Sequence, residues 1–204
     1  EAIDPVRGIT NSSSGKMAYG LARACAQAGA EVTLVSGPVA LPTPAGVSRV
    51  NVRSALEMRE AVFAALPGAQ VFIGVAAVAD YRPNMSAEHK IKKSGAELAI
   101  TLTPNPDILA EVAALPNPPF CVGFAAESHD IVRHAREKLA RKGVPLLVGN
   151  IGPATFGQDD NALLLIDAQG HRDVVDFGVG EEAFAVDFPG VLDFAAQRED
   201  GLGV

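Results

Sequence analysis

Apolar segments alternate with segments of helical periodicity along most of the chain, and this alternation is the feature that most restricts its possible folds. The pattern is typical of stacked βα units around a parallel sheet. We therefore predict an α/β fold with a mostly parallel sheet, flanking helices and a C-terminal β-hairpin. Helices are predicted over residues 15–28, 55–65, 107–114 and 130–142. Strands are predicted over residues 32–36, 71–75, 98–102, 120–125 and 146–148, and the hairpin over residues 163–166 and 173–175.

Two long connections interrupt this regular alternation. The first, "SGPVALPTPAGVSRVNV", is punctuated by prolines and is predicted to lie over the edge of the sheet. The second, residues 76–95, includes "AVADYRPNMSAEHKIKKSG". Loops of this length in a compact domain are usually functional or mobile.

The composition fits one ordinary globular domain, since 48% of the 204 residues are hydrophobic and 20% are charged. A formal net charge of −7 argues against a nucleic-acid or anionic-membrane partner. No run of about 18 apolar residues predicts a membrane span. Cys25 and Cys121 lie in apolar segments without metal-ligand spacing, so we expect buried thiols and a cytoplasmic location. The start at Glu1 rather than at a methionine suggests a piece of a longer protein.

The stretch "GITNSSSGKMAYG", residues 8–20, gathers small polar side chains before a predicted helix. Free N–H groups and the helix dipole make a helix N-terminus a suitable phosphate site, but serines there also simply cap helices. The stretch is not a Walker A loop, because six residues separate Gly8 from Gly15. It also lacks the glycine spacing of a dinucleotide fingerprint. A nucleotide-phosphate site and simple capping both remain open.

Polar residues also follow other predicted strands. In "AAVADYRP" Asp80 is expected at the carboxyl end of a strand, where open α/β sheets bind ligands. In "TPNPDILAEV" Asp107 opens a helix, either as a ligand contact or as a cap. "REKLARK" places Lys138 and Lys142 four residues apart on one helical face, as a surface stripe or as a triphosphate contact.

The motif "KIKK" places Lys90, Lys92 and Lys93 in the second long loop. The three lysines form either a flap that closes on anions or a solvated basic run. Their charges repel, and only Ile91 offers an apolar anchor. Residues 86–95 are therefore predicted to be mobile without ligand and to close when a triphosphate binds.

The motifs "DPVRGITNSSSGKMA", "VTLVSGPVALPTP", "AAVADYRP", "KIKK", "NPDILA", "GFAAES" and "GN…F…DDNALLLI" together resemble the phosphopantothenoylcysteine synthetase half of bacterial bifunctional coenzyme A biosynthesis proteins. The resemblance covers about residues 1–167. It implies a Rossmann-like homodimer, with residues 81–103 contributing to the interface. It also implies a ligase that joins 4′-phosphopantothenate to L-cysteine with CTP and Mg²⁺, through an acyl-cytidylate intermediate. In such proteins an FMN-dependent decarboxylase domain precedes this half, and we expect it to lie outside the present chain.

The resemblance further implies roles for single residues. Asn11 would hold the acyl carbonyl of the intermediate, while Lys90 would stabilise the α-phosphate and assist the cysteine step. Arg7, Ser13 and Gly15 would lie around the phosphopantothenate and phosphate groups. The other expected nucleotide-binding residues are Asp80 and Asp107 at the cytidine, Lys138 and Lys142 at the phosphates, and Ala76 and Phe124. No magnesium ligand is identified.

The chain departs from this family pattern at both ends. It starts at "EAIDPVR", so the single domain over residues 1–204 is predicted to lack the family's first, central strand. Its end, "FGVGEEAFAVDFPGVLDFAAQ", lacks a basic closing helix. The alternatives to a CTP-dependent ligase are an ATP-dependent version, an inactive nucleotide-binding module and a nicotinamide-dependent reductase. The missing dinucleotide fingerprint argues against the reductase.

Overall fold

A computed structural model describes residues 1–95, 97–127, 131–151, 161–167 and 172–177. Its helices are α1 (Lys16–Gln27), α2 (Ala55–Ala65), α3 (Ile108–Ala113) and α4 (Ile131–Lys142). Its strands are β1 (Val32–Ser36), β2 (Val47–Asn51), β3 (Val71–Gly74), β4 (Tyr81–Pro83), β5 (Leu102–Pro104), β6 (Phe120–Glu127), β7 (Leu146–Ile151), β8 (Asn161–Asp167) and β9 (Arg172–Phe177). No helix in these residues is long and apolar enough to cross a membrane.

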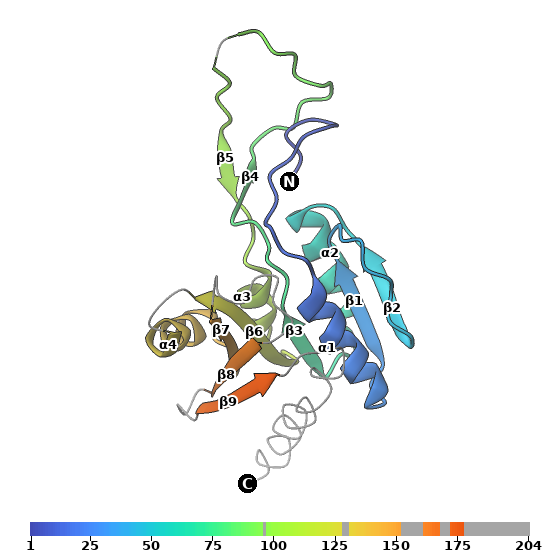
Figure 1. Cartoon of the computed structure of the whole chain (residues 1–204), viewed down its shortest axis with the longest axis vertical. Coiled ribbons are helices and arrows are strands. Elements are labelled where there is room, and N and C mark those ends of the chain that lie inside the picture. The colour runs from blue at the N-terminus through green and yellow to red at the C-terminus, as the bar shows by residue number, and fades with distance from the viewer. Residues whose placement is uncertain (96, 128–130, 152–160, 168–171, 178–204) are drawn as a thin grey trace.

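The largest sheet has five strands in the order β3-β6-β7-β8-β9. β3, β6 and β7 run parallel, with Val71 opposite Phe120 and Val122 opposite Leu146. β8 pairs antiparallel with β7 and with β9, so the predicted C-terminal hairpin is confirmed. The expected α/β class with a mostly parallel sheet and flanking helices is confirmed as well (Figure 1).

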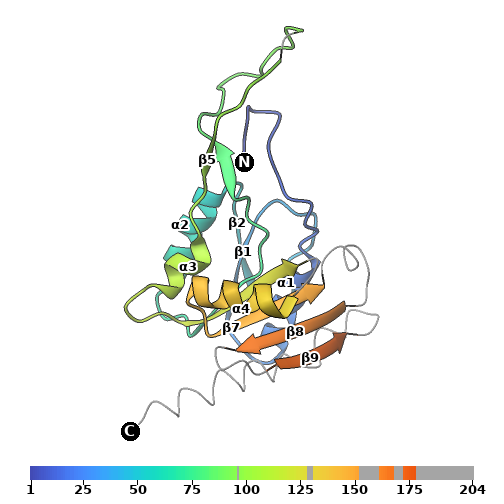
Figure 2. The same cartoon turned by 90° about the vertical axis from the view of Figure 1, so that its left-hand side faces the viewer.

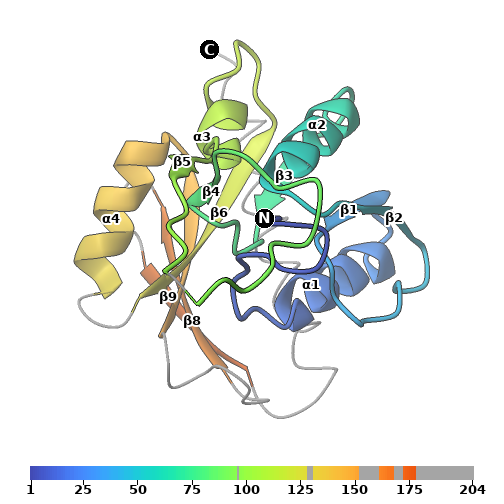
Figure 3. The same ribbon diagram turned by 90° about the horizontal axis from the view of Figure 1, so that it is seen from above.

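Helices cover both faces of this sheet because neighbouring strand residues point to opposite sides. Cys121 and Leu147 belong to the core under α2, α3 and α4. Their neighbours Val122 and Leu146 belong to a second core, which α1 covers. In the view from above, α1 and α2 lie on opposite sides of β1 and β3 (Figure 3). Two apolar layers therefore hold the sheet in place.

The connection over residues 36–52 was predicted to be a loop along the sheet edge, and this is wrong in part, because it contains β2. β2 pairs parallel with β1, with Val47 opposite Val32. A turn at Gly46, whose φ is 77°, ends the proline-rich segment just before the strand. The short strand has an irregular burial pattern. Its sequence therefore gave no clear alternation, and pairing with β1 decided its conformation.

β4 and β5 form an antiparallel pair, with Tyr81 opposite Pro104 and Pro83 opposite Leu102. β4, β5 and the loop between them make an arm, residues 81–95 and 97–104, that projects from the body beside the N-terminal segment (Figures 1 and 2). The strand predicted over residues 98–102 is wrong, because the strand begins at Leu102. β4 has three residues, so it provides pairing only for the end of "ELAITLT".

β1 and β2 form a separate two-stranded sheet, and in the described residues no ladder joins β1 to β3. α1 nevertheless packs against both parts, since Val32 of β1 and Ile73 of β3 contact the same core cluster. Two parallel strand edges thus remain unpaired beneath one helix. The absence of the family's central strand stays a prediction, and the divided sheet is consistent with it.

Candidate functional site

Gly15 ends the serine-rich loop and begins α1. Its φ of 78° is in the left-handed region, and a Cβ at this position would lie 3.0 Å from Cγ1 of Val39. No side chain caps the helix from the Gly15 position. The amides of Gly15 and Lys16 make only long contacts of 3.4 Å to the hydroxyls of Ser13 and Ser14. Simple capping thus accounts poorly for the serines, and the phosphate-site interpretation of the helix start stays a prediction.

Asn11 links this loop to the carboxyl end of the sheet. Its side-chain amide donates to the backbone oxygen of Ala77, at 2.7 Å. Ala77 follows β3 by three residues, and Ala76 and Ala77 are both exposed. The serine-rich loop and "AAVADYRP" therefore meet in the structure, at the place where α/β sheets bind ligands.

Asn105 joins the loop after β3 to the loop before α3. Its backbone N–H donates to the oxygen of Asp80 at 2.8 Å, and its side-chain amide donates to the oxygen of Ala79 at 2.8 Å. Its Oδ1 accepts from Arg82 at 3.0 Å. Asp80 itself is exposed beside this junction. In the sequence Asn105 stands two residues before the predicted helix over residues 107–114, and only its contacts with Ala79 and Asp80 reveal that it joins two loops.

Asp107 caps α3, as one of the two sequence interpretations proposed. Its Oδ1 accepts from the amide of Ala110 at 3.2 Å. Its Oδ2 pairs with the ammonium group of Lys142 at the end of α4. The side chain of Asp107 is 46% exposed and that of Lys142 is 17% exposed. Two of the predicted nucleotide-binding residues therefore meet, and Asp107 fixes the direction of Lys142.

Two other predicted nucleotide-binding residues, Lys138 and Phe124, lie on α4 and on β6. Lys138 is half-buried one turn before Lys142 on α4. Phe124 lies on β6 opposite Val148 and packs against the core that α1 covers.

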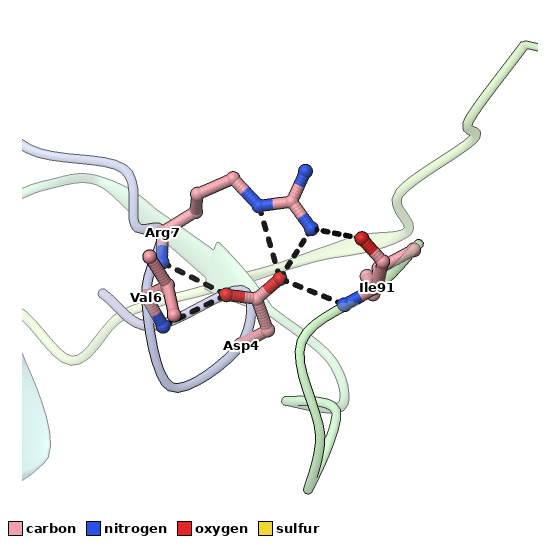
Figure 4. A network of polar contacts seen from close by, with 4 residues as sticks. All are labelled: Asp4, Val6, Arg7 and Ile91. Carbon is pink, nitrogen blue, oxygen red and sulfur yellow. Dashed lines mark hydrogen bonds and ion pairs between the residues drawn. The ribbon is translucent and has the colours of Figure 1, made fainter. Parts of the chain in front are cut away.

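Arg7 belongs to the N-terminal segment, and Lys90 belongs to the loop of the arm that projects from the body. Arg7 pairs with the buried carboxylate of Asp4, and its Nη2 also donates to the oxygen of Ile91 at 2.8 Å (Figure 4). Lys90 is exposed next to Ile91. The structure therefore joins Arg7 to the "KIKK" segment but not to Ser13 or Gly15. The sequence did not indicate Asp4, whose partner Ile91 is 87 residues away.

Charge and burial shift three pKa values. The guanidinium of Arg7 is the main cause that holds the pKa of Asp4 well below its usual range, and burial opposes this effect. Burial raises the pKa of Cys25 and that of Cys121 to about 11. Both thiols are buried, as predicted, and therefore neutral at physiological pH. No group of three or more potential metal ligands occurs among His, Cys, Asp and Glu of the described residues.

Comparison with known proteins places this arrangement in a family. Residues 1–180 match the model of the DNA/pantothenate metabolism flavoprotein C-terminal domain. The coenzyme A biosynthesis bifunctional protein CoaBC of Vibrio cholerae is 54% identical over 178 residues, which cover 84% of this chain and 45% of that protein. The Escherichia coli K12 protein of the same name is 50% identical, with 84% and 44% covered. The chain thus spans less than half the length of these relatives.

Solved structures agree with the fold. A crystal structure of the C-terminal domain of a coenzyme A biosynthesis bifunctional protein CoaBC is 34% identical, with a TM-score of 0.78, and the match covers 98% of this chain and 91% of that one. The DNA/pantothenate metabolism flavoprotein of Streptococcus pneumoniae is 22% identical with a TM-score of 0.80, covers 95% and 94%, and supports the fold alone. The resemblance predicted from the motifs is confirmed. The chain belongs to the family of the DNA/pantothenate metabolism flavoprotein C-terminal domain.

Proposed function

We propose that this chain is a phosphopantothenate–cysteine ligase that uses CTP. The position of Asn11 carries the proposal, because its amide meets the loop after β3 beside the uncapped start of α1. Anions are favoured at such a helix start, and ligands of open α/β sheets bind at this end of the strands. The high identity to bifunctional coenzyme A biosynthesis proteins supports the same assignment.

In the first half-reaction, a carboxylate oxygen of 4′-phosphopantothenate attacks the α-phosphorus of CTP. The bond to pyrophosphate breaks, and an acyl-cytidylate forms. Lys138 and Lys142 are proposed to neutralise the phosphates, and the ion pair with Asp107 orients Lys142 for this role. Mg²⁺ supplies further charge neutralisation when bound. It is usually held by substrate phosphates, waters and one or two carboxylates, so this site requires no dedicated ligand cluster.

In the second half-reaction, the amine nitrogen of cysteine attacks the acyl carbon, loses a proton, and expels CMP. The Asn11 amide has two hydrogens, of which one is bound to Ala77. We propose that the other donates to the acyl oxygen as it gains negative charge. Lys90 is proposed to stabilise the α-phosphate, which requires the arm of the same chain or of a second copy to approach Asn11.

The test measures pyrophosphate release and product formation separately, with 4′-phosphopantothenate, L-cysteine, Mg²⁺ and each of CTP, ATP and UTP. We expect both signals with CTP and the largest kcat/KM for this nucleotide. A larger kcat/KM with ATP would favour the ATP-dependent alternative. Nucleotide binding without pyrophosphate release or product would favour the inactive module. A larger rise in melting temperature with NAD than with CTP would contradict the ligase proposal.

We also propose that the chain forms a homodimer through its arm. Four large apolar side chains on this arm are strongly exposed. They are Tyr81 (52%), Met85 (81%), Leu98 (55%) and Leu102 (44%). Clustered exposed apolar groups often mark interaction surfaces, and the edges of a short strand pair need cover. By analogy with the bifunctional relatives, we propose that an FMN-dependent decarboxylase domain accompanies this chain in the full-length protein.

A further inference from the structure

Asp4 is a buried carboxylate in the N-terminal segment, beside the arm. It is 2% exposed, and its two oxygens accept hydrogen bonds from five donor atoms. Oδ1 accepts from the amides of Val6 at 2.8 Å and Arg7 at 2.9 Å. Oδ2 accepts from Nε of Arg7 at 3.0 Å, from its Nη2 at 2.5 Å and from the amide of Ile91 at 3.1 Å. A carboxylate with this many donors is strongly fixed in direction.

The two oxygens of Asp4 have different effects. Oδ1 closes a local turn within the N-terminal segment, whereas Oδ2 reaches the "KIKK" segment far along the chain (Figure 4). Nη2 of Arg7 completes the contact by donating to the oxygen of Ile91 at 2.8 Å. Both backbone groups of Ile91 are thus held by one carboxylate–guanidinium pair. A further bond joins the amide of Ala87 to the oxygen of Ile3 at 2.9 Å.

This anchoring changes the prediction for residues 86–95. The sequence offered Ile91 only as an apolar anchor, but the structure holds the segment through backbone hydrogen bonds instead. Lys90 and Lys92 are exposed on either side of Ile91. Since their like charges favour an expanded segment, an external contact is needed to keep the backbone between them in one conformation.

We propose that Asp4 is a positioning residue, which holds the backbone of Ile91 and thereby directs Lys90 for the ligase reaction. The inference rests on the proposed function, since Lys90 has a reaction to serve only if the chain is a ligase. Asp4 itself contacts neither substrate nor nucleotide in this account. Asp4 holds Arg7 directly and Lys90 through Ile91, and the proposal assigns its effect on turnover to Lys90.

Asp4→Asn tests this arrangement without destroying the local turn. The remaining oxygen can still accept from the amides of Val6 and Arg7. The new NH₂ group then faces Nε and Nη2 of Arg7 and the amide of Ile91, whose hydrogen bonds Oδ2 accepts in the wild type. Hydrogen–deuterium exchange at the amide of Ile91 should accelerate about tenfold or more. Product formation should fall on the order of tenfold to a hundredfold, because misplacement of a reacting group by about 1 Å has effects of this size.

Glu88→Gln is the matched control, because it removes one negative charge from the exposed side of the same segment. It should leave both exchange and turnover near the wild-type values. In a Lys90→Gln background, Asp4→Asn should lower turnover little further, which a general loss of structure would not produce. If Asp4→Asn does not fold, Ile91→Pro deletes the same hydrogen-bond donor with Asp4 intact. It should reproduce the loss of product formation, and exchange should then accelerate at the neighbouring amides of Lys90 and Lys92.

Each other result counts against the proposal. Unchanged exchange at Ile91 would mean that Asp4 does not hold the segment. If exchange at Ile91 is faster in Asp4→Asn but its turnover equals that of Glu88→Gln, the contact between Asp4 and Ile91 has no part in the reaction. If Asp4→Asn lowers turnover by the same factor in the wild-type and in the Lys90→Gln background, Asp4 acts by another route. Absence of product from the wild type with CTP and with ATP would instead overturn the proposed function and the role with it, while the exchange result would still decide whether Asp4 anchors Ile91.

Discussion

Asn11 is proposed to act on the acyl oxygen and Lys90 on the α-phosphate, so substitutions of these two residues should change the rates of the two half-reactions differently. Asn11→Asp places an anion beside the acyl oxygen and should slow product formation from the intermediate on the order of a hundredfold. Lys90→Gln removes a cation from the α-phosphate and should lower both half-reactions, the cysteine step more strongly. Stopped-flow pyrophosphate detection and quenched product analysis measure the two steps.

Asn117→Asp and Arg53→Gln are controls for these variants, since both residues are exposed and have no proposed role. Each repeats one of the two changes of charge outside the site. Wild-type rates of both steps in Asn11→Asp and in Lys90→Gln would mean that the assigned roles are wrong.

The two buried cysteines should make the free energy of unfolding depend on pH in the alkaline range. The pKa of a thiol in the unfolded chain is about 8.5. Burial raises the pKa of Cys25 and of Cys121 to about 11 in the folded protein. Because the folded pKa is the higher one, this contribution to stability is complete below about pH 8.5 and is lost as the pH rises toward 11. Urea midpoints should therefore fall between pH 7 and pH 10. The urea midpoint of the double variant Cys25→Ala/Cys121→Ala should fall less over the same pH interval. An equal fall in both proteins would mean that the buried thiols do not cause the pH dependence.

At the scale of elements, β6 depends on a close approach at Gly123. A Cβ at this position would lie 2.8 Å from Cδ2 of Leu109 and 2.9 Å from Cδ1 of Leu147. Leu147 is fully buried, so its side chain cannot turn away without displacing other core atoms. Gly123→Ala should destabilise the fold by about 1–3 kcal/mol in urea unfolding. Gly37→Ala has open space around the new methyl group and should change stability by less than about 0.5 kcal/mol. Equal effects of the two changes would refute the packing argument.

For the whole molecule, light scattering at micromolar concentration should give the mass of a dimer. Leu98→Asp replaces one of the exposed apolar side chains of the arm by a charge and should shift the population to monomers. Leu56→Asp is the control, because Leu56 is 42% exposed on α2, outside the arm. A monomeric wild type, or equal behaviour of the two variants, would argue against an interface on the arm.

The divided sheet leads to a second expectation for the whole molecule. β1 and β3 belong to separate sheets although α1 packs against both. An added N-terminal segment that forms an apolar strand should pair with these edges and raise the melting temperature. A glycine- and serine-rich extension of equal length should not. If both extensions gave the same melting temperature, the edges of β1 and β3 would offer no place for the strand that the chain is predicted to lack.

The sequence by itself determined the elements that depend on local patterns. The boundaries of β1 and α2 match the predictions, because a compact apolar run and a capping serine at position 54 act over a few residues. The hairpin of β8 and β9 and the strand β6 were likewise recognisable from their own composition. The order of motifs also determined the family.

Only the tertiary structure decided which distant groups meet. β2 and β5 depend on partners elsewhere in the chain, so their own residues could not define their limits. The contacts of Asn11 with Ala77 and of Asp4 with Ile91 join residues 66 and 87 positions apart. Local propensity carries no information about such pairs, because their hydrogen bonds form only after the sheet and the arm have brought the loops together.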